Sequence, residues 1–151
     1  PKGYCEIVNG SATMQAPGYG LAQDEMSSQL DVVSATLGPA DKEAWDAFRR
    51  AHDRSYFRCG RPAGGTYTPE FVGADGSLRP IPGGVNVHEV LEASPEDRIE
   101  VRQSLDGRVE MYVNDLLVAS FLDNLNNVPE SSYGMAGGTG VTFDDIEVVP
   151  K

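Results

Sequence analysis

The sequence predicts an all-β protein, an antiparallel β-sandwich of short strands, and two observations support this prediction. First, apolar and charged residues alternate with a period of two through much of the C-terminal third, which is typical of strands with one buried and one wet face. Second, the chain contains 17 glycines and 10 prolines, enough for frequent turns. The length of 151 residues is the usual size of one domain. We therefore expect a single domain over residues 1–151, either complete or as a fragment or subunit of a larger protein.

The clearest pattern is a hairpin followed by a third strand. Residues 98–102 alternate charged and apolar side chains, Asp106-Gly107 provides a turn, and residues 108–113 alternate in the returning strand. Asn114-Asp115 makes a second tight turn into residues 116–122. Three consecutive antiparallel strands are expected, and each apolar side chain on their buried face should contribute roughly 1.5–3 kcal/mol.

The last strand changes phase partway along its length. Val141 and Phe143 share one phase of the alternation, whereas Ile146 and Val148 share the opposite phase. One extra residue in the strand would reconcile the two phases. We therefore expect a β-bulge at the double aspartate, residues 144–145.

The N-terminal half predicts further strands joined by turns. Asn9-Gly10 is a strong hairpin signal between residues 4–8 and 12–15. Additional strands are expected at residues 30–36, near 66–72 and at 85–89. The glycine- and proline-rich stretch from 58 to 84 predicts long loops around one or two of these short strands.

One short peripheral helix is expected around residues 41–51. Asp41 can cap its N-terminus. Four apolar residues fall on one face at helical spacing: Ala44, Trp45, Phe48 and Ala51. This spacing indicates that Trp45 and Phe48 dock the helix on the sandwich rather than form a platform for a sugar.

The charge and the hydropathy of the chain argue against two classes of partner. Twelve basic against 23 acidic residues give a formal charge of −11, so binding to a phosphate backbone would work against the protein's own field. No apolar run approaches the roughly 20 residues needed to cross a bilayer. Neither a nucleic acid nor a membrane is therefore expected as a partner.

The two cysteines indicate no metal or redox centre. Cys5 and Cys59 lack the Cys-x-x-Cys spacing that is typical of zinc and thioredoxin-like sites. A disulfide between them and two separate buried thiols are both compatible with the sequence. No residue is assigned as a metal ligand at this level.

The C-terminal third resembles a known superfamily. The segment RIEVRQSLDGRVEMYVNDLLVASFLDN and the later YGMAGGTGVTFDDIEVVP, together residues 98–149, resemble the end of the concanavalin A-like lectin/glucanase jelly roll, including its LamG-like and 3-keto-disaccharide hydrolase-like members. Asp115 replaces the usual glycine of the Asn-Gly turn, and aspartate tolerates the left-handed conformation required there. The resemblance implies a jelly-roll sandwich that recognises a glycan or polysaccharide outside the cell or in the periplasm.

The paired carboxylates of retaining glycosidases are absent from the sequence. Such enzymes carry their acid and nucleophile on one strand, spaced Glu-x-Asp-x-x-Glu or one residue longer, and no such run occurs. Glu92, Glu96 and Asp97 lie close together, but they flank Pro95 in an expected turn. We therefore expect these carboxylates to be solvated.

A basic and aromatic cluster is the best candidate site in the sequence. Alternation would place His52, Arg54, Tyr56 and Arg58 on one side of an extended segment. The full candidate set is His52, Tyr56 and His88 as catalytic residues of an enzyme, with Arg54, Arg58, Arg61 and Tyr67 as ligand-binding residues. These residue types suit a polysaccharide lyase, which abstracts a proton beside a carboxylate and neutralises that carboxylate. Ordinary solvated charges with half-buried tyrosines are the alternative.

Three functions remain open from the sequence. The first is glycan recognition by a secreted or periplasmic domain, the second is a lyase or glycoside-cleaving enzyme of the same fold, and the third is an adhesion or assembly domain with a protein partner. Calcium is a candidate cofactor, because an oxygen-rich loop contains Asp123, Asn124, Asn126 and Asn127. A plain turn explains the same four residues.

Overall fold

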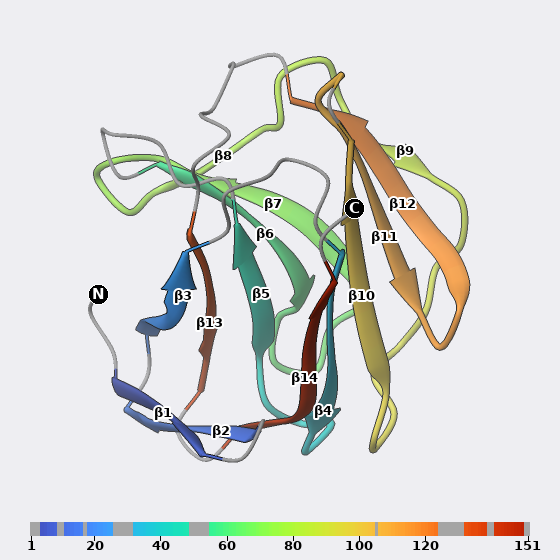
Figure 1. The fold of residues 1–151 in the computed structure, drawn as a ribbon. Helices are drawn as coiled ribbons and strands as arrows, with labels where there is room; N and C mark the ends of the chain where they lie inside the picture. Colours follow the sequence, from blue (N-terminus) through green and yellow to red (C-terminus); the bar gives the residue numbers. More distant parts are fainter. Residues whose placement is uncertain are drawn as a thin grey trace.

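The computed structural model is a sandwich of two antiparallel sheets (Figure 1). It describes residues 4–8, 11–16, 18–25, 32–48, 55–104, 106–123, 132–138 and 141–149. The strands are β1 (Tyr4–Val8), β2 (Ser11–Ala16), β3 (Gly18–Glu25), β4 (Val32–Gly38), β5 (Ala44–Phe48), β6 (Tyr56–Arg61), β7 (Thr68–Val72), β8 (Leu78–Arg79), β9 (Asn86–Val87), β10 (Arg98–Gln103), β11 (Arg108–Val113), β12 (Leu116–Leu122), β13 (Ser132–Gly137) and β14 (Thr142–Val149). The all-β sandwich predicted from the sequence is confirmed.

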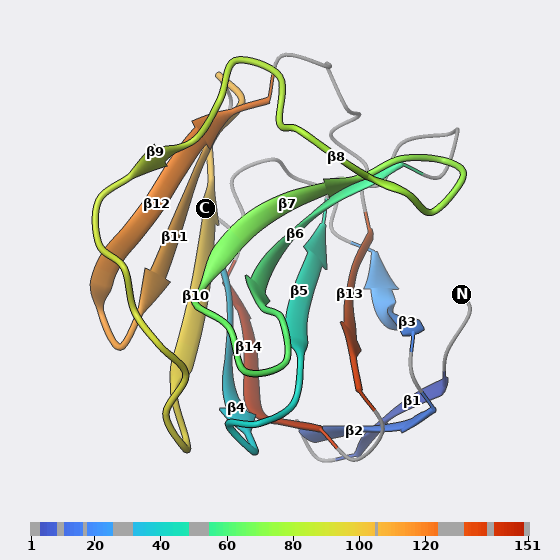
Figure 2. The same ribbon diagram turned by 180° about the vertical axis from the view of Figure 1, so that it is seen from behind.

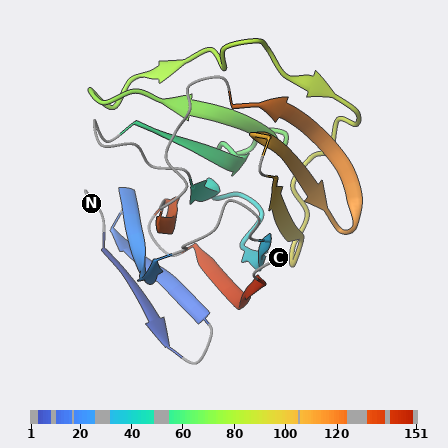
Figure 3. The same ribbon diagram turned by 45° about the horizontal axis from the view of Figure 1, so that its top comes forward.

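The two sheets draw their strands from both halves of the chain. The larger has eight strands in the order β1-β2-β14-β4-β10-β11-β12-β9, and the smaller has six in the order β3-β13-β5-β6-β7-β8. Figure 2 shows the sandwich from behind, with β5, β6 and β7 in front of β4 and β14. In Figure 3 the hairpin of β1 and β2 lies at the opposite end of the molecule from β12, as the order of the larger sheet requires.

The apolar core lies between the sheets. Strands β10 and β11 alternate half-buried or exposed residues with buried ones along their whole length, so one face of each packs inward. Phe57 of β6 lies 5.0 Å, between ring centroids, from both Phe71 of β7 and Phe121 of β12. Because Phe121 belongs to the opposite sheet, this aromatic group joins the two layers.

The predicted hairpins are confirmed. Strands β1 and β2 pair across the Asn9-Gly10 connection, and β10, β11 and β12 form the expected three-stranded meander. Asn114 and Asp115 have φ angles of 51° and 66°. Both residues of this two-residue turn are therefore left-handed, as a type I′ turn requires, and aspartate occupies the position expected for glycine.

The β-bulge in the last strand is also confirmed. The register of β14 against β4 shifts between Asp144 and Glu147, and Asp145 has a φ of 50°. Val141 and Phe143 before the shift are fully buried. Ile146 after the shift packs against the same core.

The prediction of a helix around residues 41–51 is wrong. Residues 44–48 form β5, which pairs with β13 on one side and with β6 on the other. Ala44, Trp45 and Asp46 are all buried, so this segment is covered on both faces. Apolar residues three and four apart fit a short helix as well as a doubly covered strand, and pairing with two neighbours decides for the strand. The described residues contain no helix, and thus none that could span a membrane.

Two smaller expectations need adjustment. The strand expected at residues 85–89 is the two-residue β9, and Val87 on this edge is 66% exposed. Its neighbour β12 is the only strand it pairs with among the described residues. Cys59 is a free, buried thiol, and the side chain of Cys5 lies outside the described residues.

Candidate functional site

The outer face of the smaller sheet carries the residues that sequence analysis singled out on β6. Phe57 and Cys59 point into the core, so Tyr56 and Arg58, which alternate with them, face outward. We call this surface the outer β5–β7 face and define it by Trp45, Tyr56, Arg58 and Glu70. The predicted alternation of Tyr56 with Arg58 is confirmed.

Arg58 forms the centre of the outer β5–β7 face. Its Nε and Nη2 atoms both donate to Oε1 of Glu70, over 2.9 and 2.6 Å, and its Cζ atom lies 4.1 Å from the centroid of the Trp45 ring. Trp45 is only 1% exposed and donates from Nε1 to Glu43 over 3.3 Å. The guanidinium is therefore held between a carboxylate and an indole, and its orientation is fixed.

The Arg58–Glu70 pair retains unused polar atoms. Both hydrogen bonds end on Oε1 of Glu70. Among the described residues, Nη1 of Arg58 and Oε2 of Glu70 therefore have no hydrogen-bond partner. The side chains are 17% and 24% exposed, so both reach solvent. The pair can offer an unused donor atom and an unused acceptor atom to a ligand.

Arg61 and Tyr67, which sequence analysis assigned to ligand binding, lie inside the protein instead. Arg61 is fully buried and donates from Nη1 to the Tyr67 hydroxyl over 2.6 Å, from Nη2 to the Pro39 carbonyl over 2.7 Å and from Nε to the Lys42 carbonyl over 3.2 Å. Burial, followed by the hydrogen bond to Asp97, raises the pKa of Tyr67 well above its ordinary value. Both side chains act within the protein rather than on its surface.

Asp97 completes this buried network, and the expectation that it is solvated is wrong. Its Oδ2 atom accepts from the Tyr67 hydroxyl over 2.7 Å and from the Ser94 amide over 2.8 Å, while Oδ1 accepts from Nδ2 of Asn114 over 2.9 Å. The carboxylate is buried, and these three hydrogen bonds compensate for the hydration that it loses there. The pairing of Ser94 with Asp97, three residues apart, was the only local signal for it in the sequence.

The three proposed catalytic residues do not meet among the described residues. His88 follows β9 at the edge of the larger sheet, is exposed, and has its Nε2 atom 3.0 Å from Oγ of Ser120. Tyr56 lies in the smaller sheet. His52 lies outside the described residues, as does Arg54. Of the described residues in the predicted set, only Tyr56 and Arg58 therefore share one surface.

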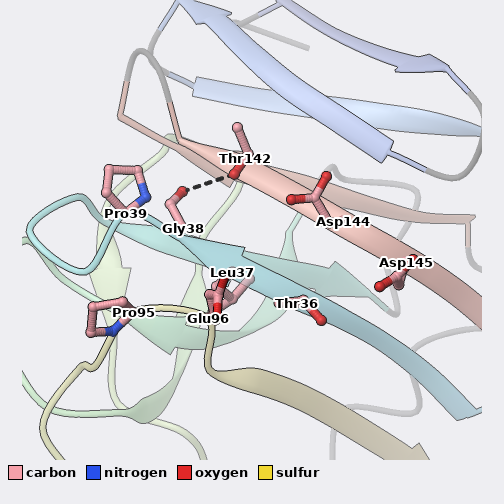
Figure 4. A pocket seen from close by; sticks show the side chains of 9 residues that line it. All are labelled: Thr36, Leu37, Gly38, Pro39, Pro95, Glu96, Thr142, Asp144 and Asp145. Atoms are coloured by element: carbon pink, nitrogen blue, oxygen red, sulfur yellow. Dashed lines mark hydrogen bonds between the residues drawn. The ribbon is translucent and has the colours of Figure 1, made fainter.

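A second feature is an open depression at the junction of β4 and β14 (Figure 4). It has a volume of about 580 Å³ and is lined by residues 36–39, 95–96, 142 and 144–145. Thr142 donates from Oγ1 to the Gly38 carbonyl over 3.3 Å. The sequence indicated a bulge at the double aspartate of this surface and a turn with solvated carboxylates at Pro95 and Glu96.

No metal centre occurs in the part of the chain that the structure describes. No three histidine, cysteine, aspartate or glutamate side chains gather there in a way that could hold an ion. Asp123 of the oxygen-rich loop is buried. Asn124, Asn126 and Asn127 of that loop lie outside the described residues.

Comparison with known proteins identifies the fold. No protein-family model matches the sequence, and no curated protein matches it either. Among solved structures, the carbohydrate-binding module CBM66 from Bacillus subtilis matches with a TM-score of 0.68 at 12% identity, over 97% of this chain and 91% of that chain. Galectin LEC-6 from Caenorhabditis elegans matches with a TM-score of 0.57 at 16% identity, over 95% of this chain and 99% of that one.

An enzyme module shares the same architecture. The β-fructofuranosidase of Aspergillus kawachii matches with a TM-score of 0.63 at 14% identity, over 97% of this chain but only 27% of that chain. The chain thus has the concanavalin A-like jelly-roll fold that the C-terminal third predicted. The likeness extends over nearly the whole chain, including the N-terminal half where the sequence offered no such resemblance.

Proposed function

We propose that this protein is a carbohydrate-recognition domain that binds a glycan on the outer β5–β7 face. The observation that carries the proposal is the fixed Arg58–Glu70 pair, with a spare donor and a spare acceptor next to the half-buried ring of Tyr56. Sugar hydroxyls donate and accept hydrogen bonds at once, so a free donor and a free acceptor on one face can both bind sugar hydroxyls. A tyrosine ring provides an apolar surface for the C–H face of a sugar.

The charges favour a neutral glycan over an acidic one. Glu70 neutralises Arg58 at 2.6 Å, so no unpaired cation defines the centre of the face. The chain as a whole carries a formal charge of −11 and repels polyanions. A neutral oligosaccharide meets neither obstacle.

The comparisons support this class of function without specifying the sugar. One matching structure is named as a carbohydrate-binding module, another as a galectin, and a third as a β-fructofuranosidase. Fructo-oligosaccharides therefore belong in any panel of probes, beside galactosyl and glucosyl oligosaccharides. We extend the proposal to an extracellular or periplasmic location, where such polymers occur.

The test is calorimetry with neutral and acidic oligosaccharides, with and without calcium. At least one neutral oligosaccharide should bind, and Arg58→Ala should weaken its binding about tenfold or more, the cost of one charged hydrogen-bonding group. Arg58→Lys keeps the charge but loses the planar fork, so it should fall between the two. Arg108→Ala, which removes an exposed arginine of β11, is the matched control.

Two results would contradict the proposal. Wild-type protein that binds no sugar in the panel would remove the function altogether. Sugar binding that is equal in the wild type and in the folded Arg58→Ala variant would remove the outer β5–β7 face as its site.

A further inference from the structure

The depression between β4, β14 and the 95–96 turn lies on a different part of the fold from the outer β5–β7 face. Its strands belong to the larger sheet, whereas Tyr56 and Arg58 belong to the smaller one. Its volume of about 580 Å³ falls within the range of pockets that hold small ligands. It can therefore act independently of the outer β5–β7 face.

The lining combines apolar walls with hydrogen-bonding groups. Figure 4 shows Pro39 at the end of β4 and Pro95 on the side of β4 away from β14, while Thr142 and Asp144 project from β14. The lining contains no lysine, arginine, histidine or aromatic residue. Such a surface suits a ligand that donates hydrogen bonds and carries no negative charge, and it offers no ring for stacking.

Buried hydrogen bonds hold the walls of this depression in place. Arg61 donates to the Pro39 carbonyl over 2.7 Å, which holds the segment after β4. Asp97 accepts from the Ser94 amide over 2.8 Å, and its own carbonyl accepts from the Leu37 amide over 2.7 Å. The Tyr67 hydroxyl joins Arg61 to Asp97, so a single buried network supports both walls. The depression is therefore preorganised, and binding a ligand does not have to pay for ordering its walls.

We propose that this depression is a second binding site, which takes one residue of a neutral saccharide. Its acceptors would receive the hydroxyl protons of the sugar, since the Asp144 and Glu96 carboxylates are both exposed at its rim. The carbon skeleton of the sugar would contact Pro39 and Pro95. The location follows from the depression itself, while the saccharide class rests on the proposed function.

Nuclear magnetic resonance tests the proposal, because it locates binding as well as detecting it. The isotope-labelled protein is titrated with fructo-oligosaccharides, lactose and cello-oligosaccharides, and separately with ethanolamine and with calcium chloride. We expect a neutral saccharide to shift the amide signals of residues 36–38 and 142–145. Asp144→Ala should lower the affinity obtained from these shifts about tenfold. Asp144→Asn should lower that affinity less, because an amide oxygen still accepts a hydrogen bond.

Matched variants separate this site from the outer β5–β7 face. Glu89→Ala removes an exposed carboxylate next to β9, at the edge of the same sheet and outside the depression, and should leave the shifts unchanged. Arg58→Ala should abolish shifts on the outer β5–β7 face only.

Three other results of the titration would contradict the second site, its ligand class or both proposals. Shifts confined to the outer β5–β7 face would contradict the second site and leave the proposed function intact. Shifts at the depression with ethanolamine or calcium but with no saccharide would contradict the ligand class. The absence of any shift with every saccharide would contradict both proposals.

Discussion

Strands β10–β11 and strand β5 show two ways in which a sequence encodes a strand. In β10 and β11 apolar side chains alternate with charged ones, because one face meets the core and the other meets water. In β5 three consecutive residues, Ala44, Trp45 and Asp46, are buried. Period-two alternation therefore reveals strands with one wet face and disappears where both faces are covered.

The residues that bury the two faces of β5 are distant from this strand along the chain. Arg58 stacks over Trp45 on the outer side, while Ala44 faces the core on the inner side. Neither contact can be deduced from local spacing, since both depend on the pairing of β5 with β6. The same pairing builds the outer β5–β7 face, so the strand that sequence analysis missed is the one that supports the candidate site.

The largest expected effect is the loss of Trp45. If Trp45 fills a covered position of a central strand, Trp45→Ala should lower the free energy of unfolding by about 3–5 kcal/mol, the usual cost of truncating a large buried side chain. Tyr112→Ala, on the half-buried outer face of β11, should cost clearly less. Urea denaturation of both variants checks this. Equal costs for the two would contradict the contrast between the regions.

The next effect is a pH dependence that comes from Asp46. Neither oxygen of its carboxylate has a hydrogen-bond partner among the described residues, and burial raises its pKa to about 8, although the charge of Arg98 acts to lower it. The folded state therefore holds a proton that the unfolded state releases above about pH 4. Stability from this group is fully present below about pH 3.8 and is lost as the pH rises to about 8.

A single variant isolates this contribution. Between pH 6 and pH 8 the wild type should lose about 2 kcal/mol of unfolding free energy relative to Asp46→Asn, which cannot ionise. Urea denaturation at the two pH values measures the difference. A gap between the proteins that does not change with pH would show that Asp46 carries no such proton.

A smaller effect is expected from the buried network behind β6. Tyr67→Phe removes the hydroxyl that joins Arg61 to Asp97 and leaves two buried polar groups with fewer partners. It should cost about 1–2 kcal/mol, whereas Tyr112→Phe on the outer face of β11 should be nearly neutral. Thermal or urea unfolding of the pair distinguishes them. A neutral Tyr67→Phe would mean that the network does not stabilise the fold.

The parts of the fold that the sequence predicted share a physical cause. Turn residues such as Asn114 and Asp115 act locally, and the phase change around Asp144 is visible within a few residues. Burial of Asp97 was missed because its partner Tyr67 lies 30 residues away. Contacts of that range depend on how the two sheets pack, which no local pattern records.

The residues of the candidate site also differ in whether a local pattern or a long-range contact sets their position. Tyr56 and Arg58 lie two residues apart on β6, so alternation alone placed them on one face. Glu70 was not identified, because its place opposite Arg58 is set by the register between β6 and β7. Arg61 has the residue type of a ligand-binding side chain, but it follows Gly60 at the end of β6 and is buried.

A crystal structure of the protein with the neutral oligosaccharide that binds it most tightly would test the central claim most directly. We expect a sugar ring against Tyr56, with hydroxyls bonded to Nη1 of Arg58 and Oε2 of Glu70. A sugar bound elsewhere, over an outer β5–β7 face that remains empty, would contradict the assignment of this surface as the glycan site.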